Sequence, residues 1–205
     1  MRLILVRHGE TCWNKERRVQ GGDSDIELNE TGLDQAKRLA SFLENENIVA
    51  VYASPMRRAM ATAGPIASRH GLPVEVDRRL IEIRVGELEG TSVLHLNTTF
   101  SQFLMERWSD RTVESTDGET IEVLLRRVWP VVEGLLDRHD ACDGHNGDHS
   151  VVIVSHFFVT LAILLKALDL PTDSFPRFKV DLGSVSTLEF SDHGTRLLTF
   201  NDVSY

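Results

Sequence analysis

Short apolar runs alternate along the chain with longer segments of helical spacing. The runs cover residues 3–6, 48–53, 151–154, 185–190 and 197–200, with a brief extended stretch at 74–76. They are apolar or β-branched, which is typical of strands buried in a core. Strands that alternate with helices predict an α/β fold with a largely parallel sheet.

Two of the predicted helices carry clear signals. Residues 33–43 place apolar side chains on one helical face, behind a polar residue, Asn29 or Thr31, that can cap the first turn. A longer helix is expected from about residue 119 to 138. Pro130 lies inside it and should kink it or split it in two, because proline lacks the backbone N–H and clashes with the preceding turn.

The composition is that of an ordinary globular chain, with 205 residues, 41% hydrophobic and 26% charged. This length can bury a full core, and no repeat or linker divides it, so residues 1–205 are expected to form one domain. The net charge of −9 would repel a polyanion, which argues against a nucleic-acid partner.

The cysteines and apolar segments bear on the compartment. Cys12 and Cys142 lie far apart in a chain too large to need disulfide staples, which suits a reducing environment. The run at 3–6 is too brief for a secretion signal, and no segment reaches the roughly 18 apolar residues of a membrane span. We therefore expect a cytoplasmic protein without a membrane partner.

Polar clusters follow the predicted strands directly. They are "RHG" at 7–9, "SPMRR" at 54–58 and "SH" at 155–156, and Glu82 follows the short stretch at 74–76. Because ligands bind outside the carboxyl ends of strands in open α/β sheets, we expect these residues to share one edge of the sheet.

Such a group of residues suits phosphoryl transfer. Arginine forks bind phosphate oxygens, a neutral imidazole can attack phosphorus, and a protonated carboxyl group can donate to the leaving oxygen. Two arginines and two histidines already supply positive charge, so neither a metal nor a cofactor is expected. Taken alone, Glu82 has a less favoured alternative, an exposed carboxylate in a charged loop.

Six motifs in order along the chain resemble the histidine phosphatase superfamily, in its phosphoglycerate mutase-like branch. They are "LVRHGET", "VQGG", "ELNETG", "SPMRRAMATA", "LIEIRVGELEG" and "VVIVSH". The resemblance implies a three-layer α/β/α sandwich. It also implies that His8 is the phosphorylated nucleophile, that Glu82 is the general acid and base, and that Arg7, Arg58 and His156 hold the phosphoryl group.

The resemblance also implies binding roles for further residues, on weaker motif matches. Asn14 is expected to contact phosphate, and Gln20 and Gly21 to line the substrate pocket. The family usually has glycine after the second histidine, whereas this chain has Phe157. Phenylalanine would be strained if the position needs a positive φ, but it fits if only a helix-start N–H is needed, and it would then add an aromatic wall.

Two further segments could carry function. The stretch at about 91–111 reads either as a lid insert over the pocket or as a helix packed on the core. The loop at 140–149 contains cysteine, histidine and aspartate, but its spacing matches no zinc pattern, so a solvated connection is favoured.

The leading prediction is a metal-independent phosphomonoester hydrolase that acts on a small phosphorylated metabolite through a phosphohistidine. The alternatives are a cofactor-dependent phosphoglycerate mutase and, in a different class, a non-catalytic phosphate-binding module. The family's mutases generally have a longer insert and a C-terminal tail, whereas only about thirty residues separate Gly90 from Glu119 here and the chain ends soon after its last predicted strand. The predicted catalytic residues contact only the phosphoryl group, so they do not identify which phosphate ester is the substrate. A homodimer is possible, because dimers are the commonest oligomers.

Overall fold

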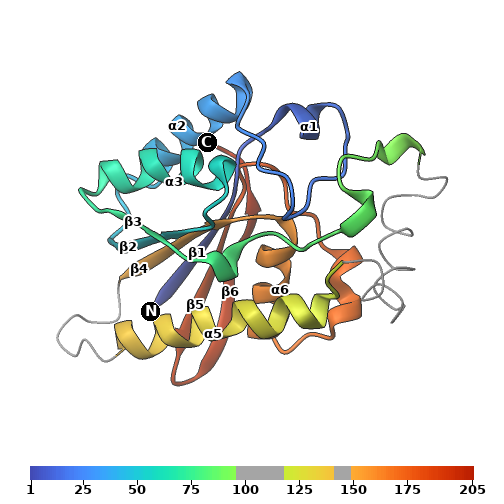
Figure 1. Cartoon of the computed structure of the whole chain (residues 1–205). Helices are drawn as coiled ribbons and strands as arrows, with labels where there is room; N and C mark the ends of the chain where they lie inside the picture. Colours follow the sequence, from blue (N-terminus) through green and yellow to red (C-terminus); the bar gives the residue numbers. More distant parts are fainter. Residues whose placement is uncertain (96–117, 141–148) are drawn as a thin grey trace.

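The central element of the computed structural model is a mixed sheet, within described residues 1–95, 118–140 and 149–205. Its six strands lie in the order β3-β2-β4-β1-β5-β6 (Figure 1). Their bounds are Arg2–Arg7 for β1, Ile48–Ala53 for β2, Val74–Val76 for β3, Ser150–Ser155 for β4, Val185–Ser191 for β5 and Gly194–Asp202 for β6. The first four in that order run parallel, whereas β5 is antiparallel to both of its neighbours. Four carboxyl ends therefore meet at one edge.

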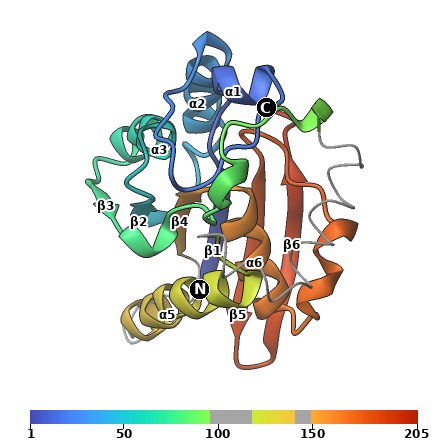
Figure 2. The ribbon, with the colours of Figure 1, turned by 45° about the vertical axis from the view of Figure 1, so that its right-hand side comes forward.

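Helices cover both faces of this sheet. The α-helices are α1 Cys12–Lys15, α2 Glu30–Phe42, α3 Arg57–Arg69, α5 Ile121–Asp140 and α6 Phe157–Ala167. Single 3₁₀ turns or short 3₁₀ helices are η1 Arg78–Leu80, η2 Gly86–Leu88, η3 Val93–His95 and η5 Thr172–Arg177. Figures 1 and 2 show α2 and α3 on one side of the sheet and α5 and α6 on the other. The predicted three-layer α/β/α sandwich is confirmed.

Strand β1 supplies side chains to both halves of the core. Leu3 and Leu5 pack with α5 and α6, whereas Ile4 and Val6 pack with α2 and α3. Successive side chains of a strand point to opposite faces, so a strand covered on both sides is apolar at every position. This is why residues 3–6 form an unbroken apolar run.

Helix α5 differs from its prediction. It runs as one helix from Ile121 to Asp140, with Pro130 inside, so of the two predicted outcomes, a kink or a split, the split is wrong. Pro130 faces solvent, while Leu124, Val128 and Val132 of the same helix are completely buried. Packing of that apolar face outweighs the local cost of proline. No helix in the described part of the chain is both long and apolar enough to cross a bilayer.

The start of α2 lies directly against the loop that follows β1. Asn29 caps the helix by accepting from Gly32 N at 2.9 Å. A Cβ atom on Gly32 would lie 2.1 Å from the backbone oxygen of Glu10, and one on Gly9 would lie 2.7 Å from that of Gly32. Only glycine at both positions permits this approach.

We expect Gly32→Ala to lower the free energy of unfolding by about 1–3 kcal/mol, because the new methyl group would force α2 away from Glu10. The matched control is Gly134→Ala in α5, where a Cβ atom meets nothing within 4 Å and no proline follows. This control should stabilise the protein by about 0.5–1 kcal/mol through its better helix propensity. Urea unfolding measures both values, and equal effects of the two substitutions would contradict the close approach.

Candidate active site

Side chains from four separate segments meet at the carboxyl edge of the sheet. His8 follows β1, Arg58 lies in the first turn of α3 after β2, His156 follows β4, and Glu82 follows η1. All four are buried, with exposed fractions of 3% for His8 and Glu82 and 0% for Arg58 and His156. Polar and charged groups buried to this degree need partners, and the contacts below identify them.

His8 is held as a neutral imidazole with a defined tautomer. Its backbone N–H donates to Ser155 O at 2.9 Å, which sets the ring beside the end of β4. Nδ1 lies 2.7 Å from Gly9 O, so Nδ1 carries the proton and Nε2 keeps its lone pair. Burial, with Arg58 and Arg7 nearby, lowers the pKa of His8 well below its usual value. The ring therefore presents a neutral nucleophilic nitrogen.

His156 packs against His8, with ring centroids 5.1 Å apart. Arg58 Nε donates to His156 Nδ1 at 3.3 Å, so the proton must lie on Nε2, which is 2.9 Å from Ser54 Oγ. Burial and the charge of Arg58 lower the pKa of His156 well below its usual value. Ser54 belongs to the polar cluster at 54–58 that was expected at this edge, but nothing in the sequence indicated its contact with His156.

The guanidinium of Arg58 ties this histidine to a distant loop. Nη1 donates to Ser24 O at 2.8 Å and Nη2 donates to Gly21 O at 2.9 Å. Burial lowers the pKa of Arg58, against attraction from nearby carboxylates. The preceding Arg57 is exposed and pairs with Glu27, so Arg58 is the arginine of the doublet that reaches the histidines.

Arg7 lies beside the aromatic residue that follows His156. Its Nη1 donates to Val180 O at 2.5 Å, and its Cζ lies 5.2 Å from the centroid of the Phe157 ring. Burial lowers its pKa to about 10, which leaves it charged at neutral pH. Nε is buried without a hydrogen-bond partner among the described residues, so it is a donor that an anion could use.

Phe157 is accommodated without strain. It is the first residue of α6, with His156 as the N-cap, and its φ is not positive. The backbone N–H of the next residue, Phe158, donates to Glu82. The position thus needs only a helix start, which phenylalanine can form as well as glycine.

The carboxyl group of Glu82 is buried between two backbone donors. Ile83 N donates to Oε1 at 2.8 Å and Phe158 N donates to Oε2 at 3.1 Å. Burial raises the pKa of Glu82, although these donors and the nearby arginines act in the opposite direction. The raised pKa brings Glu82 closer to the pH range in which a carboxyl group can act as a general acid.

Asn14 and Gln20 meet through Thr11, a residue that the sequence reasoning did not single out. Thr11 N donates to Asn14 Oδ1 at 3.1 Å, and Thr11 Oγ1 lies 3.0 Å from Gln20 Oε1. Gly21 N donates to both carboxylate oxygens of Glu89, at 3.0 and 3.1 Å. These residues are therefore linked to the central cluster through the loop that Arg58 holds.

Two segments singled out in the sequence lie largely outside the described residues. These are residues 96–111 of the expected lid and residues 141–148 of the loop with Cys142. Leu94, in the described start of the lid segment, is 72% exposed. Within the described residues, no three histidine, cysteine, aspartate or glutamate side chains gather where they could hold a metal ion.

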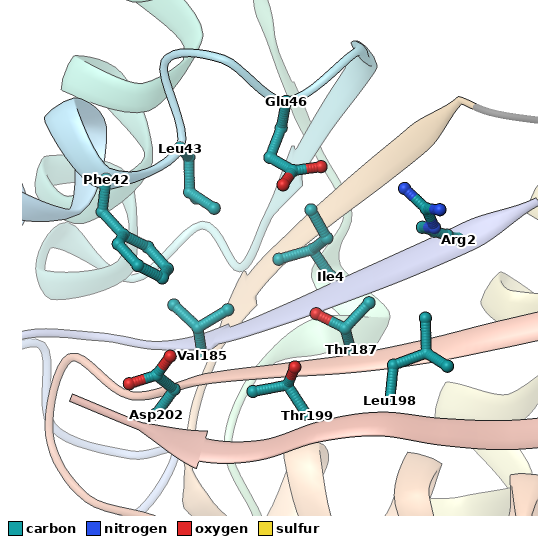
Figure 3. Close-up of a pocket in the computed structure, with 10 residues that line it drawn as sticks. All are labelled: Arg2, Ile4, Phe42, Leu43, Glu46, Val185, Thr187, Leu198, Thr199 and Asp202. Atoms are coloured by element: carbon teal, nitrogen blue, oxygen red, sulfur yellow. The ribbon is translucent and has the colours of Figure 1, made fainter. Parts of the chain in front are cut away.

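A cavity of about 180 Å³ lies apart from the cluster, between the end of α2 and strands β1, β5 and β6 (Figure 3). Ile4 and Phe42 line it on the apolar side, and Arg2, Glu46 and Asp202 contribute charges. None of the five residues predicted to be catalytic lines it, so it is not the site described above.

Comparison with known proteins links the whole chain to one family. Residues 3–203 match the histidine phosphatase superfamily (branch 1). Phosphoserine phosphatase 1 of Hydrogenobacter thermophilus is 32% identical over 203 residues, which are 98% of this chain and 92% of the relative. A probable phosphoglycerate mutase of Yersinia pestis is 30% identical over 198 residues, covering 94% and 86% of the two chains.

The fold has a matching solved structure. A mycobacterial glucosyl-3-phosphoglycerate phosphatase, solved with VO3, superimposes with a TM-score of 0.86 at 28% identity and covers 98% of each chain. The similarity therefore extends over nearly the whole length of both proteins.

The two buried histidines predict a pH-dependent stability. Below the unfolded-state pKa of about 6.5, His8 and His156 bind protons in the unfolded chain but stay neutral in the native state. The free energy of unfolding should therefore fall as the pH drops below that value. His8→Gln and His156→Gln should each reduce this slope by up to about 1.4 kcal/mol per pH unit.

Urea unfolding at pH values from 8 to 5 measures this slope. At pH 8 the histidines are neutral in both states, so the difference at that pH reports the packing change and can be subtracted. A slope that is the same in the wild type and in both variants would contradict buried, neutral imidazoles.

Proposed function

The chain belongs to branch 1 of the histidine phosphatase superfamily, and on that premise we propose that this phosphomonoesterase acts through a phosphohistidine formed on His8. The observation that carries the proposal is the tautomer of His8. Its Nδ1 is committed to Gly9 O at 2.7 Å, which leaves the Nε2 lone pair for attack.

In the first step, His8 Nε2 attacks phosphorus while the ester P–O bond breaks. Arg7, Arg58 and His156 surround the transferring group with donors, and their placement in a buried site strengthens each interaction. The products of this step are the phosphorylated histidine and an alcohol.

Glu82 supplies the proton that the departing oxygen needs. Its raised pKa favours the protonated form that can donate it. Once ionised, the carboxylate takes a proton from an attacking water, whose oxygen displaces His8 from phosphorus. Inorganic phosphate leaves, and both residues return to their starting states.

The relatives support a small phosphorylated metabolite as the substrate. Proteins similar to this chain are named for phosphoserine and glucosyl-3-phosphoglycerate, both small phosphorylated metabolites. We assign Asn14, Gln20, Gly21 and Phe157 to binding of such an ester. This rests on the Arg58 contact to Gly21 and on the position of Phe157 beside Arg7. Positive charge comes from side chains, so the mechanism uses no metal or cofactor.

A mutase is the second candidate, because a relative named as a probable phosphoglycerate mutase is 30% identical. A mutase would pass the phosphoryl group of His8 to a second hydroxyl rather than to water. The same residues serve both reactions, so the acceptor distinguishes them.

We expect His8→Ala to lose phosphatase activity by roughly 10³-fold or more, because no nucleophile would remain. The assay is release of inorganic phosphate from a panel of phosphomonoesters in excess EDTA. His193→Ala is the matched control, since His193 is exposed in the turn between β5 and β6. Phosphate release that is unaffected by His8→Ala would contradict the mechanism, and phosphoryl transfer between hydroxyls without release would favour the mutase.

Glu82→Gln should slow hydrolysis of alkyl phosphates by about 10²–10⁴-fold, because an alkoxide needs protonation. The loss should be smaller with p-nitrophenyl phosphate, whose leaving group is stable as an anion. Glu87→Gln is the control, a substitution of an exposed glutamate in η2. Equal losses on the two kinds of ester would show that Glu82 does not protonate the leaving group.

A further inference from the structure

We infer that Arg127 and Glu119 are positioning residues that aim the carboxyl group of Glu82, an inference that rests on the acid role proposed above. Arg127 lies on α5 and Glu119 lies two residues before that helix begins. The pair forms a clamp on the backbone that carries Glu82.

Arg127 holds this backbone at two points. Its Nη1 donates to Arg79 O at 2.6 Å and its Nη2 donates to Glu82 O at 3.0 Å. One planar guanidinium therefore spans the segment from η1 to Glu82. A rigid fork with five N–H donors suits this task, whereas lysine offers a single flexible ammonium.

Glu119 fixes the guanidinium and the next part of the segment together. Arg127 Nε and Nη2 donate to its two carboxylate oxygens, each at 2.8 Å. Arg84 N donates to Glu119 Oε2 at 2.9 Å, and Glu119 N donates to Arg84 O at 2.8 Å. The side chains of Arg127 and Glu119 are only 24% and 13% exposed. Their bidentate ion pair therefore stabilises the segment more than an ordinary surface ion pair would.

The opposite side of the segment is held by a glycine. Gly22 N donates to Ile83 O at 3.0 Å, and a Cβ atom on Gly22 would lie 2.5 Å from Glu82 O. The backbone of Glu82 is thus fixed between this loop and the clamp. Its carboxyl group meets Phe158 N at the start of α6, which packs beside α5.

The clamp binds backbone atoms of residues 79, 82 and 84, and none of these hydrogen bonds goes to His8 or to the arginines beside it. Loss of the clamp should therefore leave His8 and its neighbouring arginines in place, but the carboxyl group of Glu82 would no longer be held in one orientation. A displacement near 1 Å can cost about 10²-fold in rate when it misplaces a catalytic group. The loss should appear only in the step that needs the acid.

The test is Arg127→Met, which keeps the apolar stem and removes the fork. Hydrolysis of an alkyl phosphate should fall by about 10²-fold while hydrolysis of p-nitrophenyl phosphate changes little. Arg126→Met is the matched control, because Arg126 is exposed on the same helix and, among the described residues, its side chain donates to Glu122 O of its own turn. It should change neither rate.

A double variant separates positioning from general damage. If the clamp acts through Glu82, adding Arg127→Met to Glu82→Gln should cause no further loss with the alkyl phosphate. Losses that multiply, or equal losses of Arg127→Met on both esters, would overturn the inference. Should Arg127→Met fold poorly by circular dichroism, Arg127→Lys and Glu119→Gln are judged by the same dependence on the leaving group.

Failure of the proposed function would look different. Equal losses of Glu82→Gln on both esters would remove the acid role, and the inference would fall with it. Dependence on the leaving group in Glu82→Gln but not in Arg127→Met would overturn the inference alone.

Discussion

Burial of the Arg58 guanidinium imposes the constraint around which the site is assembled. A cation that is removed from water needs an acceptor for its N–H groups, and an unsatisfied one would cost about 1–3 kcal/mol or more. Arg58 finds acceptors at Gly21 O, Ser24 O and His156 Nδ1. A single side chain thereby fixes the loop after α1, the first turn of α3 and the ring that follows β4.

The same positive charge helps burial to keep the neighbouring histidines neutral. Burial is the largest cause that lowers the pKa of His8 and of His156, and Arg58 is the next. A protonated ring beside two arginines would add a further buried cation, so both rings stay neutral. Neutral imidazoles are also what the proposed chemistry requires, because the attacking nitrogen must keep its lone pair.

The two layers of helices support different parts of the candidate site. On one face, α2 approaches the loop after His8 through paired glycines, and Thr62 of α3 accepts from Gly9 N at 3.1 Å. On the other face, α6 donates Phe158 N to Glu82, and α5 supplies Arg127 behind it. The proposed nucleophile and the proposed acid are therefore held from opposite sides of the sheet.

The sequence by itself determined the strands, the class of fold and the order of chemical groups at the strand ends, because these depend on local periodicity and on short motifs such as residues 7–9. Only the tertiary structure decided that α5 continues through Pro130, because packing of its buried face sets that outcome. Only the tertiary structure identifies the contact of His156 with Ser54 and that of Arg127 with the backbone of Glu82. These contacts join residues 45 to 102 positions apart, and such pairs leave no period or spacing along a single chain.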